Sequence, residues 1–426
     1  MVPQGDRGKP NIENILGSAI IELALAKNHL AKYVDLDDMH YACNLKRSGE
    51  GRPGLYDLEL ISQSWRGITW IHRIRLLIPK GTARPYVVLM VTGSGDGHEE
   101  LDLCGEISRL TGMAVAILHD VPNQPLFGNL YEDALMAYTF AKFLEGDGWD
   151  WPLLLPMVKG VVKAMDAIEG LYEKITGTKA SGFIVTGASK RGWTTWLSAI
   201  VDERIKGIAP MVYDNLNLHA QMRHQRECYG GYSEQISDYT ALGLQEKMDS
   251  EGGRRLVEII DPYAYRDELE LPKLIINGTN DRFWTIDSLN LYFNDLLGEK
   301  YVLYVPNSGH GLEDRRRVMN SLSAFALSVS EAMTMPRMKV EYPANSEVDV
   351  ELDIEPRYID AWSAKSSSMD FRDSKWASEP VEGVGMRRYH YESRAGGSLT
   401  ARFIESSFHT NGFPFTLSSP MRLTKP

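Results

Sequence analysis

The chain has 426 residues, a formal net charge of −11 and 43% hydrophobic residues, a balance that favours one large globular domain with a smaller one beside it. The excess of acidic residues argues against nucleic acid as the main partner. No apolar run reaches the roughly 20 residues of a membrane span, and the polar first ten residues contain no signal core, which predicts a cytoplasmic chain.

Three cysteines, Cys43, Cys104 and Cys228, are too few and too scattered to form a disulfide framework. Cys228 lies near His219 and His224, which raises the question of a metal site. One cysteine and two histidines in a polar segment are more often incidental than ligands. We therefore expect neither a metal nor a cofactor.

Residues 1–54 are predicted to form an N-terminal helix and a loop. Apolar residues recur at helical spacing over 11–33, and the segment after them is rich in glycine near its end. Two alternating segments follow, 55–65 and 69–78, and predict an antiparallel hairpin. We expect the main domain to begin with this hairpin and to span residues 55–335.

A glycine-rich loop follows the next predicted strand. The continuous apolar run at 86–91 predicts a fully buried strand, and it ends in Thr-Gly-Ser-Gly-Asp-Gly at 92–97. A helix and a further strand over 99–118 complete a βαβ unit. The loop has neither the Gly-x-Gly-x-x-Gly spacing of a dinucleotide site nor the Lys-Ser/Thr of a P-loop. It is more consistent with an oxyanion-binding loop, with Ser94 or Gly95 supplying a backbone N–H.

Residues 181–193, Ser-Gly-Phe-Ile-Val-Thr-Gly-Ala-Ser-Lys-Arg-Gly-Trp, are central to the interpretation. A buried strand at 183–185 leads through a tight turn into a helix, and Ser189 lies on that turn. This arrangement is typical of the nucleophile elbow of α/β-hydrolases. The residue two after the serine is normally small, but here it is Arg191, and the glycine follows as Gly192. The alternative is a serine that only caps the helix.

Further buried strands are predicted at 205–213, 274–277 and 301–305. Residues 214–270 contain no clear strand and are predicted to form a helical cap over the site. A helix is expected at 285–297. The predicted architecture is therefore an α/β-hydrolase fold, with a mostly parallel sheet and helices on both faces.

The composition changes after residue 335, where short segments alternate polar and apolar residues between polar turns. This pattern predicts a small antiparallel β-sandwich over 336–426.

Ser189, Asp281 and His310 each follow a buried strand within a few residues of its carboxyl end. These ends share one edge of a parallel sheet, and the order Ser, Asp, His is that of α/β-hydrolases. In this interpretation Ser189 attacks an acyl carbon, His310 transfers the proton and Asp281 orients the imidazole. Asp214, at the end of the preceding strand, is the alternative acid.

Lys190 is expected to supply the first oxyanion N–H from its backbone. Its ammonium and the Arg191 guanidinium lie at a helix N-terminus, where the helix dipole disfavours cations. Either they lie near developing negative charge or an acidic substrate group, or they are solvated. Arg191, Trp193 and Trp284 are the candidate substrate contacts.

Five motifs of the chain together point to a known family. They are Ser-Gln-Ser-Trp-Arg-Gly (62–67), Gly-Ala-Ser-Lys-Arg-Gly-Trp (187–193), Gly-Tyr-Ser-Glu-Gln-Ile-Ser-Asp-Tyr (231–239), Asn-Gly-Thr-Asn-Asp (277–281) and Asn-Ser-Gly-His (307–310). Through them the chain resembles the PhoPQ-activated pathogenicity-related protein family of α/β-hydrolase-fold proteins over residues 30–420.

The resemblance implies a serine hydrolase framework with Ser189, Asp281 and His310 in catalytic positions, but no particular substrate. Members of the family are often exported, in contrast to the cytoplasmic location expected from the polar N-terminus. The elbow is also similar to that of glucuronoyl esterases, which place arginine directly after the serine, where this chain has Lys190.

The function predicted from these observations is hydrolysis of a small-molecule carboxylic ester through an acyl-enzyme. A peptidase or amidase with the same triad is one alternative. A binding or signalling protein without catalysis is the other. The sequence leaves the oligomeric state open.

Overall fold

The computed structural model describes residues 29–48, 54–81, 84–344, 347–385, 387–392, 398–410 and 412–424. The helix predicted over 11–33 lies mostly outside these residues, and its described part, 29–34, is helical. No helix in the described part of the chain is long and apolar enough to cross a membrane.

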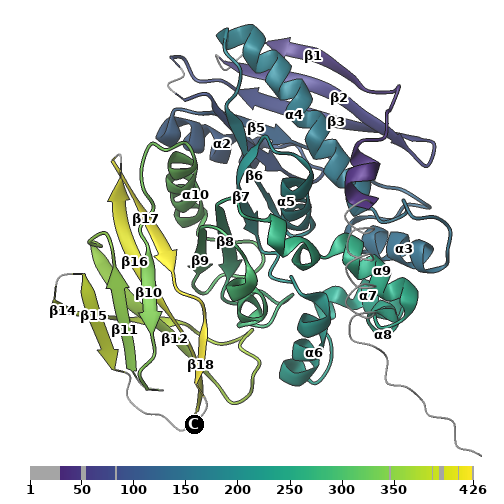
Figure 1. Cartoon of the computed structure of the whole chain (residues 1–426). Coiled ribbons are helices and arrows are strands. Elements are labelled where there is room, and N and C mark those ends of the chain that lie inside the picture. Colours follow the sequence, from purple (N-terminus) through teal and green to yellow (C-terminus); the bar gives the residue numbers. More distant parts are fainter. Residues whose placement is uncertain are drawn as a thin grey trace, which may run out of the picture.

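A parallel sheet forms the centre of the molecule, with strand order β5-β4-β6-β7-β8-β9 (Figure 1). Its strands are largely apolar and almost fully buried, as expected for strands covered on both faces. They are β4 (Tyr86–Val91), β5 (Ala114–Leu118), β6 (Gly182–Ala188), β7 (Ile205–Met211), β8 (Lys273–Gly278) and β9 (Lys300–Val305).

Helices cover both faces of this sheet. On one face α2 (His98–Thr111) packs against α10 (Arg315–Val329), and on the other α4 (Leu154–Thr176) packs against α5 (Lys190–Val201). Successive residues of β4 alternate between the two cores, since side chains of a strand point to opposite faces in turn. The architecture confirms the predicted α/β-hydrolase fold.

Antiparallel strands extend the sheet beyond β5 at the top of Figure 1. β2 (Leu55–Trp65) and β3 (Ile68–Leu77) form the predicted hairpin, but β1 (Ala42–Ser48) lies in a segment predicted as loop. The residues of β1 are largely exposed, so they show no buried alternation. Charged side chains are typical of an edge strand, and in β1 Lys46 forms an ion pair with Glu59 at 2.8 Å.

The segment between β7 and β8 is helical, as expected for a cap. Helix α3 (Glu132–Leu144) precedes this cap in the chain. It packs against three helices of the cap, α7, α8 and α9. The elements of the cap are α6 (Leu218–Tyr229), η1 (Glu234–Ile236), α7 (Ser237–Ala241), α8 (Leu244–Lys247), α9 (Glu251–Ile260) and η2 (Pro262–Glu268).

The prediction of a helix at 285–297 is wrong. Two short 3-10 turns, η3 (Ser288–Leu291) and η4 (Phe293–Asp295), stand in its place. Carbonyls that an α-helix would use internally accept hydrogen bonds from side chains instead: Ser288 O from Gln221 Nε2 (3.0 Å) and Phe293 O from Lys300 Nζ (2.6 Å). Contacts with the cap and with β9 thus override the local helical pattern.

The C-terminal region forms two antiparallel sheets whose facing residues share a core. The first contains β10 (Met338–Glu341), β11 (Glu347–Leu352), β14 (Glu382–Gly385) and β15 (Arg388–Glu392). The second contains β12 (Tyr358–Ser366), β13 (Ala377–Pro380), β16 (Leu399–Thr410), β17 (Phe413–Ser418) and β18 (Arg422–Thr424).

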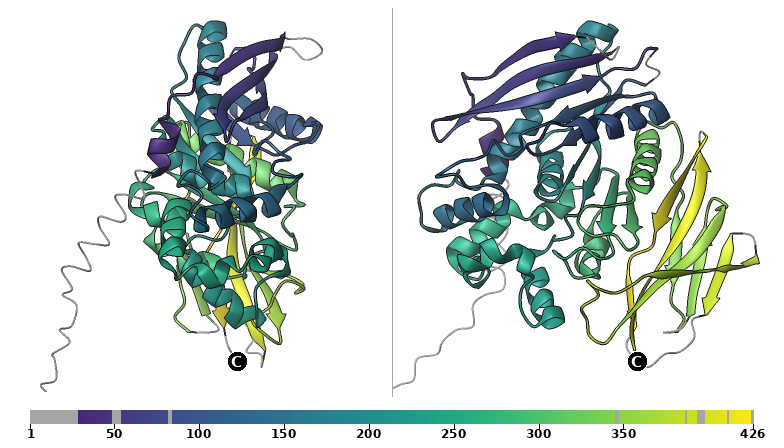
Figure 2. Two further views of the ribbon diagram at one scale, coloured as in Figure 1. Left: turned by 90° about the vertical axis from the view of Figure 1, so that its right-hand side faces the viewer. Right: turned by 180° about the vertical axis from the view of Figure 1, so that it is seen from behind.

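The second sheet continues the central one, which the sequence did not predict. β17 pairs with β9 through Ser418 and Val302, and Ser418 Oγ also accepts a hydrogen bond from Tyr304 N at 3.0 Å. Helices α7, α8 and α9 of the cap lie on the opposite side of the molecule from the C-terminal sheets (Figure 2). The loop between β12 and β13 nevertheless reaches the cap, where Arg372 Nη1 lies 2.6 Å from Glu234 Oε2.

Candidate active site

The turn between β6 and α5 holds Ser189 in a strained conformation, with φ 58° and ψ −127°. A positive φ costs a non-glycine residue about 1–3 kcal/mol and is common at functional sites. Two glycines permit the close approach that the turn requires. A Cβ on Gly187 would lie 2.8 Å from Arg191 O, and one on Gly192 would lie 2.8 Å from Met211 O. Gly192 therefore packs beneath the turn, which explains how Arg191 can occupy the position that is usually small.

His310 and Asp281 are joined by a hydrogen bond of 2.8 Å between Nδ1 and Oδ2. Asp281 Oδ1 accepts a second hydrogen bond from the backbone N–H of Phe283 at 2.9 Å, which fixes the carboxylate. Both residues follow strand ends at the same edge of the sheet, as predicted. Asp214, the alternative acid, instead accepts a hydrogen bond from the Tyr292 hydroxyl at 2.6 Å.

Phe283 contacts His310 and lines the same pocket as Ser189. The ring centroids of Phe283 and His310 are 4.1 Å apart. No hydrogen bond joins His310 Nε2 to Ser189, and this buried nitrogen has no partner among the described residues. It is therefore available as a proton acceptor, and catalytic hydrogen bonds often form fully only when substrate is bound.

Lys190 and Arg191 are buried and paired with two carboxylates at the start of α3. Arg191 binds Glu132 through both terminal nitrogens at 2.7 Å, and Lys190 Nζ lies 2.7 Å from Glu132 and 3.4 Å from Asp133. Asp133 also accepts a hydrogen bond from the Tyr239 hydroxyl at 2.9 Å. The alternative of two solvated cations is thus wrong, because both side chains are buried and paired with carboxylates.

Glu132 is the centre of this network. Burial opposes its ionisation, but the hydrogen bonds and charges of Arg191 and Lys190 hold the pKa of Glu132 well below its usual range. Its backbone has a positive φ of 46°, a strained conformation at the first residue of α3. The network therefore ties the elbow helix α5 to α3.

Glu132→Gln is expected to lower the free energy of unfolding by about 2 kcal/mol, because it leaves two buried cations with one carboxylate. This value is below the roughly 3–5 kcal/mol expected for a fully buried pair, since the Glu132 side chain is 41% exposed. Thermal unfolding measures the effect. Glu99→Gln, which removes an exposed pair with Arg315, is the matched control and should change stability by at most about 0.5 kcal/mol. Equal shifts in the two variants would contradict the structural role of Glu132.

The glycine loop after β4 reaches the elbow through Gly93. A Cβ there would lie 2.4 Å from Arg191 Nη2, so the guanidinium packs directly under the loop. Ser94 and Gly95 are exposed, and the Gly95 carbonyl accepts a hydrogen bond from Arg73 at 2.6 Å. Neither residue is among those described as lining the pocket, so their oxyanion role stays a prediction.

Among the candidate substrate contacts, Trp193 and Trp284 line the pocket, and Arg191 does not. Trp193 stacks on Tyr213 with ring centroids 4.8 Å apart, and Trp284 meets the same ring edge-on at 5.8 Å. Both indole N–H groups donate to backbone carbonyls, Trp193 to Ile260 and Trp284 to Val212. The two rings therefore present apolar surface to the pocket.

Burial raises the pKa of the Asp214 carboxyl to about 7. The folded protein then binds this proton more tightly than the unfolded chain, whose carboxyl has a pKa near 3.8. The free energy of unfolding should fall as the pH rises from about 4 to 7. Above pH 7 this carboxyl should cause no further loss of stability.

Asp214→Asn is expected to remove this pH dependence. The melting temperature of the variant, relative to that of the unmodified protein, should be higher at pH 8 than at pH 4.5. Asp267→Asn, at an exposed position, is the control and should show no such change. The same relative melting temperature at both pH values would show that Asp214 is ionised in the folded protein at pH 4.5 and above.

His224, Cys228 and Asp287 place their ligand atoms within 4.8 Å of one another. His219, which the sequence also suggested, lies 3.3 Å from Asp249 instead. His224 Nε2 lies 2.7 Å from Asp287 Oδ1, and this hydrogen bond, together with that to Cys228, raises the pKa of His224 to about 10. The contact between His224 and Asp287 joins α6 to the segment after β8.

The loop between β12 and β13 contacts both loops that carry Asp281 and His310. Asn280 Nδ2 donates to the carbonyls of Arg372 (3.1 Å) and Ser374 (2.7 Å). Asn307 exchanges two hydrogen bonds with the Trp376 backbone, at 3.1 and 2.8 Å. These contacts could not be predicted from the sequence, because they join segments about 70 to 90 residues apart whose side chains follow no periodic pattern.

The strand order and the residues at the sheet edge together define an α/β-hydrolase fold. The chain belongs to the PhoPQ-activated pathogenicity-related protein family, whose family model matches residues 30–372. This confirms the resemblance drawn from the motifs.

The comparisons also include individual relatives. Autocrine proliferation repressor protein A of Dictyostelium discoideum is 35% identical over 302 residues, which cover 66% of this chain and 61% of that protein. Acetyl xylan esterase 1 from Thermoanaerobacterium sp. JW/SL YS485 matches with a TM-score of 0.50 and 15% identity, over 72% of this chain and 93% of the other. An acetyl xylan esterase from Paenibacillus sp. R4 matches with a TM-score of 0.49 and 16% identity, over 70% and 93% of the two chains. At 15% identity, the match with acetyl xylan esterase 1 supports the fold alone.

Proposed function

We propose that the chain is a serine hydrolase that cleaves carboxylic esters through Ser189, His310 and Asp281. The observation that carries the proposal is the His310–Asp281 hydrogen bond, at the sheet edge where the strained Ser189 lines a pocket. A strained serine on a strand-to-helix turn and a carboxylate-bound histidine are the parts that nucleophilic acyl transfer requires.

In the proposed mechanism, Ser189 Oγ attacks the acyl carbon while His310 Nε2 takes the hydroxyl proton. Asp281 keeps the proton of the imidazole on Nδ1 and stabilises the imidazolium that forms. The backbone N–H of Lys190, at the start of α5, stabilises the oxyanion together with an N–H of the glycine loop. His310 then gives its proton to the leaving alcohol, and water hydrolyses the acyl-enzyme by the same steps.

The test is turnover of p-nitrophenyl esters, together with labelling of Ser189 by a fluorophosphonate probe. A panel of peptide p-nitroanilides distinguishes ester hydrolysis from the peptidase or amidase alternative. Labelling and ester turnover are expected. Failure of both would contradict the proposal.

A signalling role without catalysis is the second candidate function. It is favoured by the name of the Dictyostelium relative, a repressor of proliferation, with which this chain shares 35% identity. The absence of both probe labelling and turnover would favour this candidate.

A further inference from the structure

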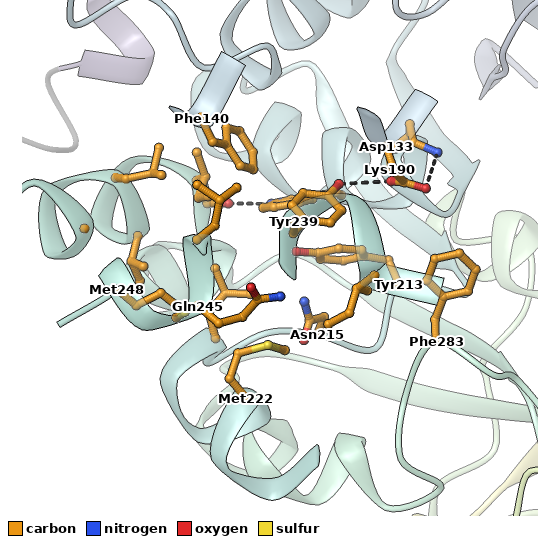
Figure 3. Close-up of a pocket in the computed structure, with 18 of the residues that line it drawn as sticks. Asp133, Phe140, Lys190, Tyr213, Asn215, Met222, Tyr239, Gln245, Met248 and Phe283 are labelled. Atoms are coloured by element: carbon orange, nitrogen blue, oxygen red, sulfur yellow. Dashed lines mark hydrogen bonds and ion pairs between the residues drawn. The ribbon is translucent and has the colours of Figure 1, made fainter. Parts of the chain in front are cut away.

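The pocket beside Ser189 is lined mostly by apolar and aromatic side chains. It contains about 810 Å³ of empty space, including its opening to solvent. Helices α3 and α5 and the cap provide its walls (Figure 3), with Phe140, Leu144, Trp193, Met222, Met248 and Leu256 among the lining residues.

Several of the polar groups around this pocket are already bonded within the protein. Lys190 and Asp133 form an ion pair, and the hydroxyl of Tyr239 donates to Asp133 (Figure 3). The indole N–H groups of Trp193 and Trp284 are bound to carbonyls. The wall therefore offers little for a group with many hydroxyls, such as a sugar.

Two amide side chains are the exception. Asn215 Oδ1 and Gln245 Oε1 are buried and have no hydrogen-bond partner among the described residues. Asn215 is only 6% exposed, and the buried hydroxyl of Tyr213 lies beside it. All three residues line the pocket (Figure 3). A buried acceptor without a partner costs about 1–3 kcal/mol, so a ligand that supplies a donor here would be favoured by a similar amount.

The position of His310 indicates which half of an ester occupies the pocket. His310 does not line the pocket, but its imidazole lies against the ring of Phe283, which does. The leaving alcohol must receive a proton from His310, so it has to lie toward the imidazole rather than deep in the pocket. The acyl group has no such requirement and can fill the pocket.

We propose that the substrate of the ester hydrolysis proposed above has an apolar acyl group that carries a hydroxyl, which Asn215 and Gln245 bind. The apolar body is held by the walls contributed by the cap, α3 and α5. The hydroxyl donates to a free amide oxygen, and the Tyr213 hydroxyl can contribute to the same network.

The experiment compares matched pairs of methyl esters: 3-(4-hydroxyphenyl)propanoate against 3-phenylpropanoate, and 6-hydroxyhexanoate against hexanoate, with acetate as the short reference. We expect all four longer esters, the two six-carbon esters and the two aryl esters, to be cleaved with higher kcat/KM than the acetate. Within at least one pair, the hydroxylated ester should be favoured by about 10- to 100-fold, as expected for one hydrogen bond to an otherwise unpaired buried group.

Gln245→Leu should remove this preference, whereas Gln235→Leu, at an exposed position of the cap outside the pocket, should keep it. Melting temperatures of both variants show whether they fold. Calorimetric binding of the corresponding acids to the Ser189→Ala protein makes the same comparison without turnover.

Cleavage of the longer esters with no preference for the hydroxyl would overturn the inference, and so would cleavage of acetate alone. In both cases the proposed ester hydrolysis would stand. Absence of turnover and of probe labelling would overturn the proposed function and, with it, this inference.

Discussion

Ser189→Ala is expected to lower kcat for ester hydrolysis by about 10⁴-fold or more, the loss seen when the nucleophile of a serine hydrolase is removed. Alanine cannot form an acyl-enzyme, and it has the same backbone preferences as serine at the strained turn, so the fold should be kept. The matched control is Ser181→Ala, an exposed serine just before the other end of the same strand. Rates of p-nitrophenyl ester turnover measure both effects.

Similar kcat values for Ser189→Ala and for the unmodified protein would show that another group is the nucleophile. Loss of fluorophosphonate labelling in Ser189→Ala, with labelling kept in Ser181→Ala, would provide independent support. The labelling result matters because it does not depend on choosing a good substrate.

Asp281→Asn is expected to lower kcat by about 10⁴-fold, since an amide in place of the carboxylate favours the wrong imidazole tautomer. Asp281 Oδ2 lies 2.8 Å from His310 Nδ1, so the substitution acts directly on the base. Asp214→Asn is the matched control, because Asp214 follows the neighbouring strand but binds Tyr292. Its kcat should stay within a few-fold of that of the unmodified protein.

The opposite result, with Asp214→Asn as the more damaging change, would reassign the triad acid. A pH profile of kcat/KM adds a second measurement. Asp281→Asn should change its acidic limb, which reports the base of the free enzyme, and Asp214→Asn should not.

Much of the fold could be predicted from the sequence because its signals are local. The central strands are continuous apolar runs, and the polar residues after them had to meet at one edge of the sheet. The hydrogen bond between Asp281 and His310 agrees with this reasoning. Their catalytic roles, and that of Ser189, stay predictions.

The features that the sequence did not predict depend on distant partners. Glu132 gave no sign that it would bind Arg191, because 59 residues separate them in the chain. β1 has mostly exposed residues and therefore lacks the alternation that identifies a strand. The segment 285–297 has a helical pattern, but side chains from the cap and β9 occupy its carbonyls.

The contacts of Asn280 and Asn307 with the β12–β13 loop have a consequence for how the site is assembled during translation. A ribosome completes the elbow and both triad loops well before residues 372–376 emerge, and β17, which closes the edge of β9, emerges later still. On a nascent chain the two asparagines lack these partners, so the loops that hold the carboxylate and the imidazole are not yet fixed. The proposed catalytic site is thus expected to be fixed only near the end of synthesis, when the distal strands join the sheet.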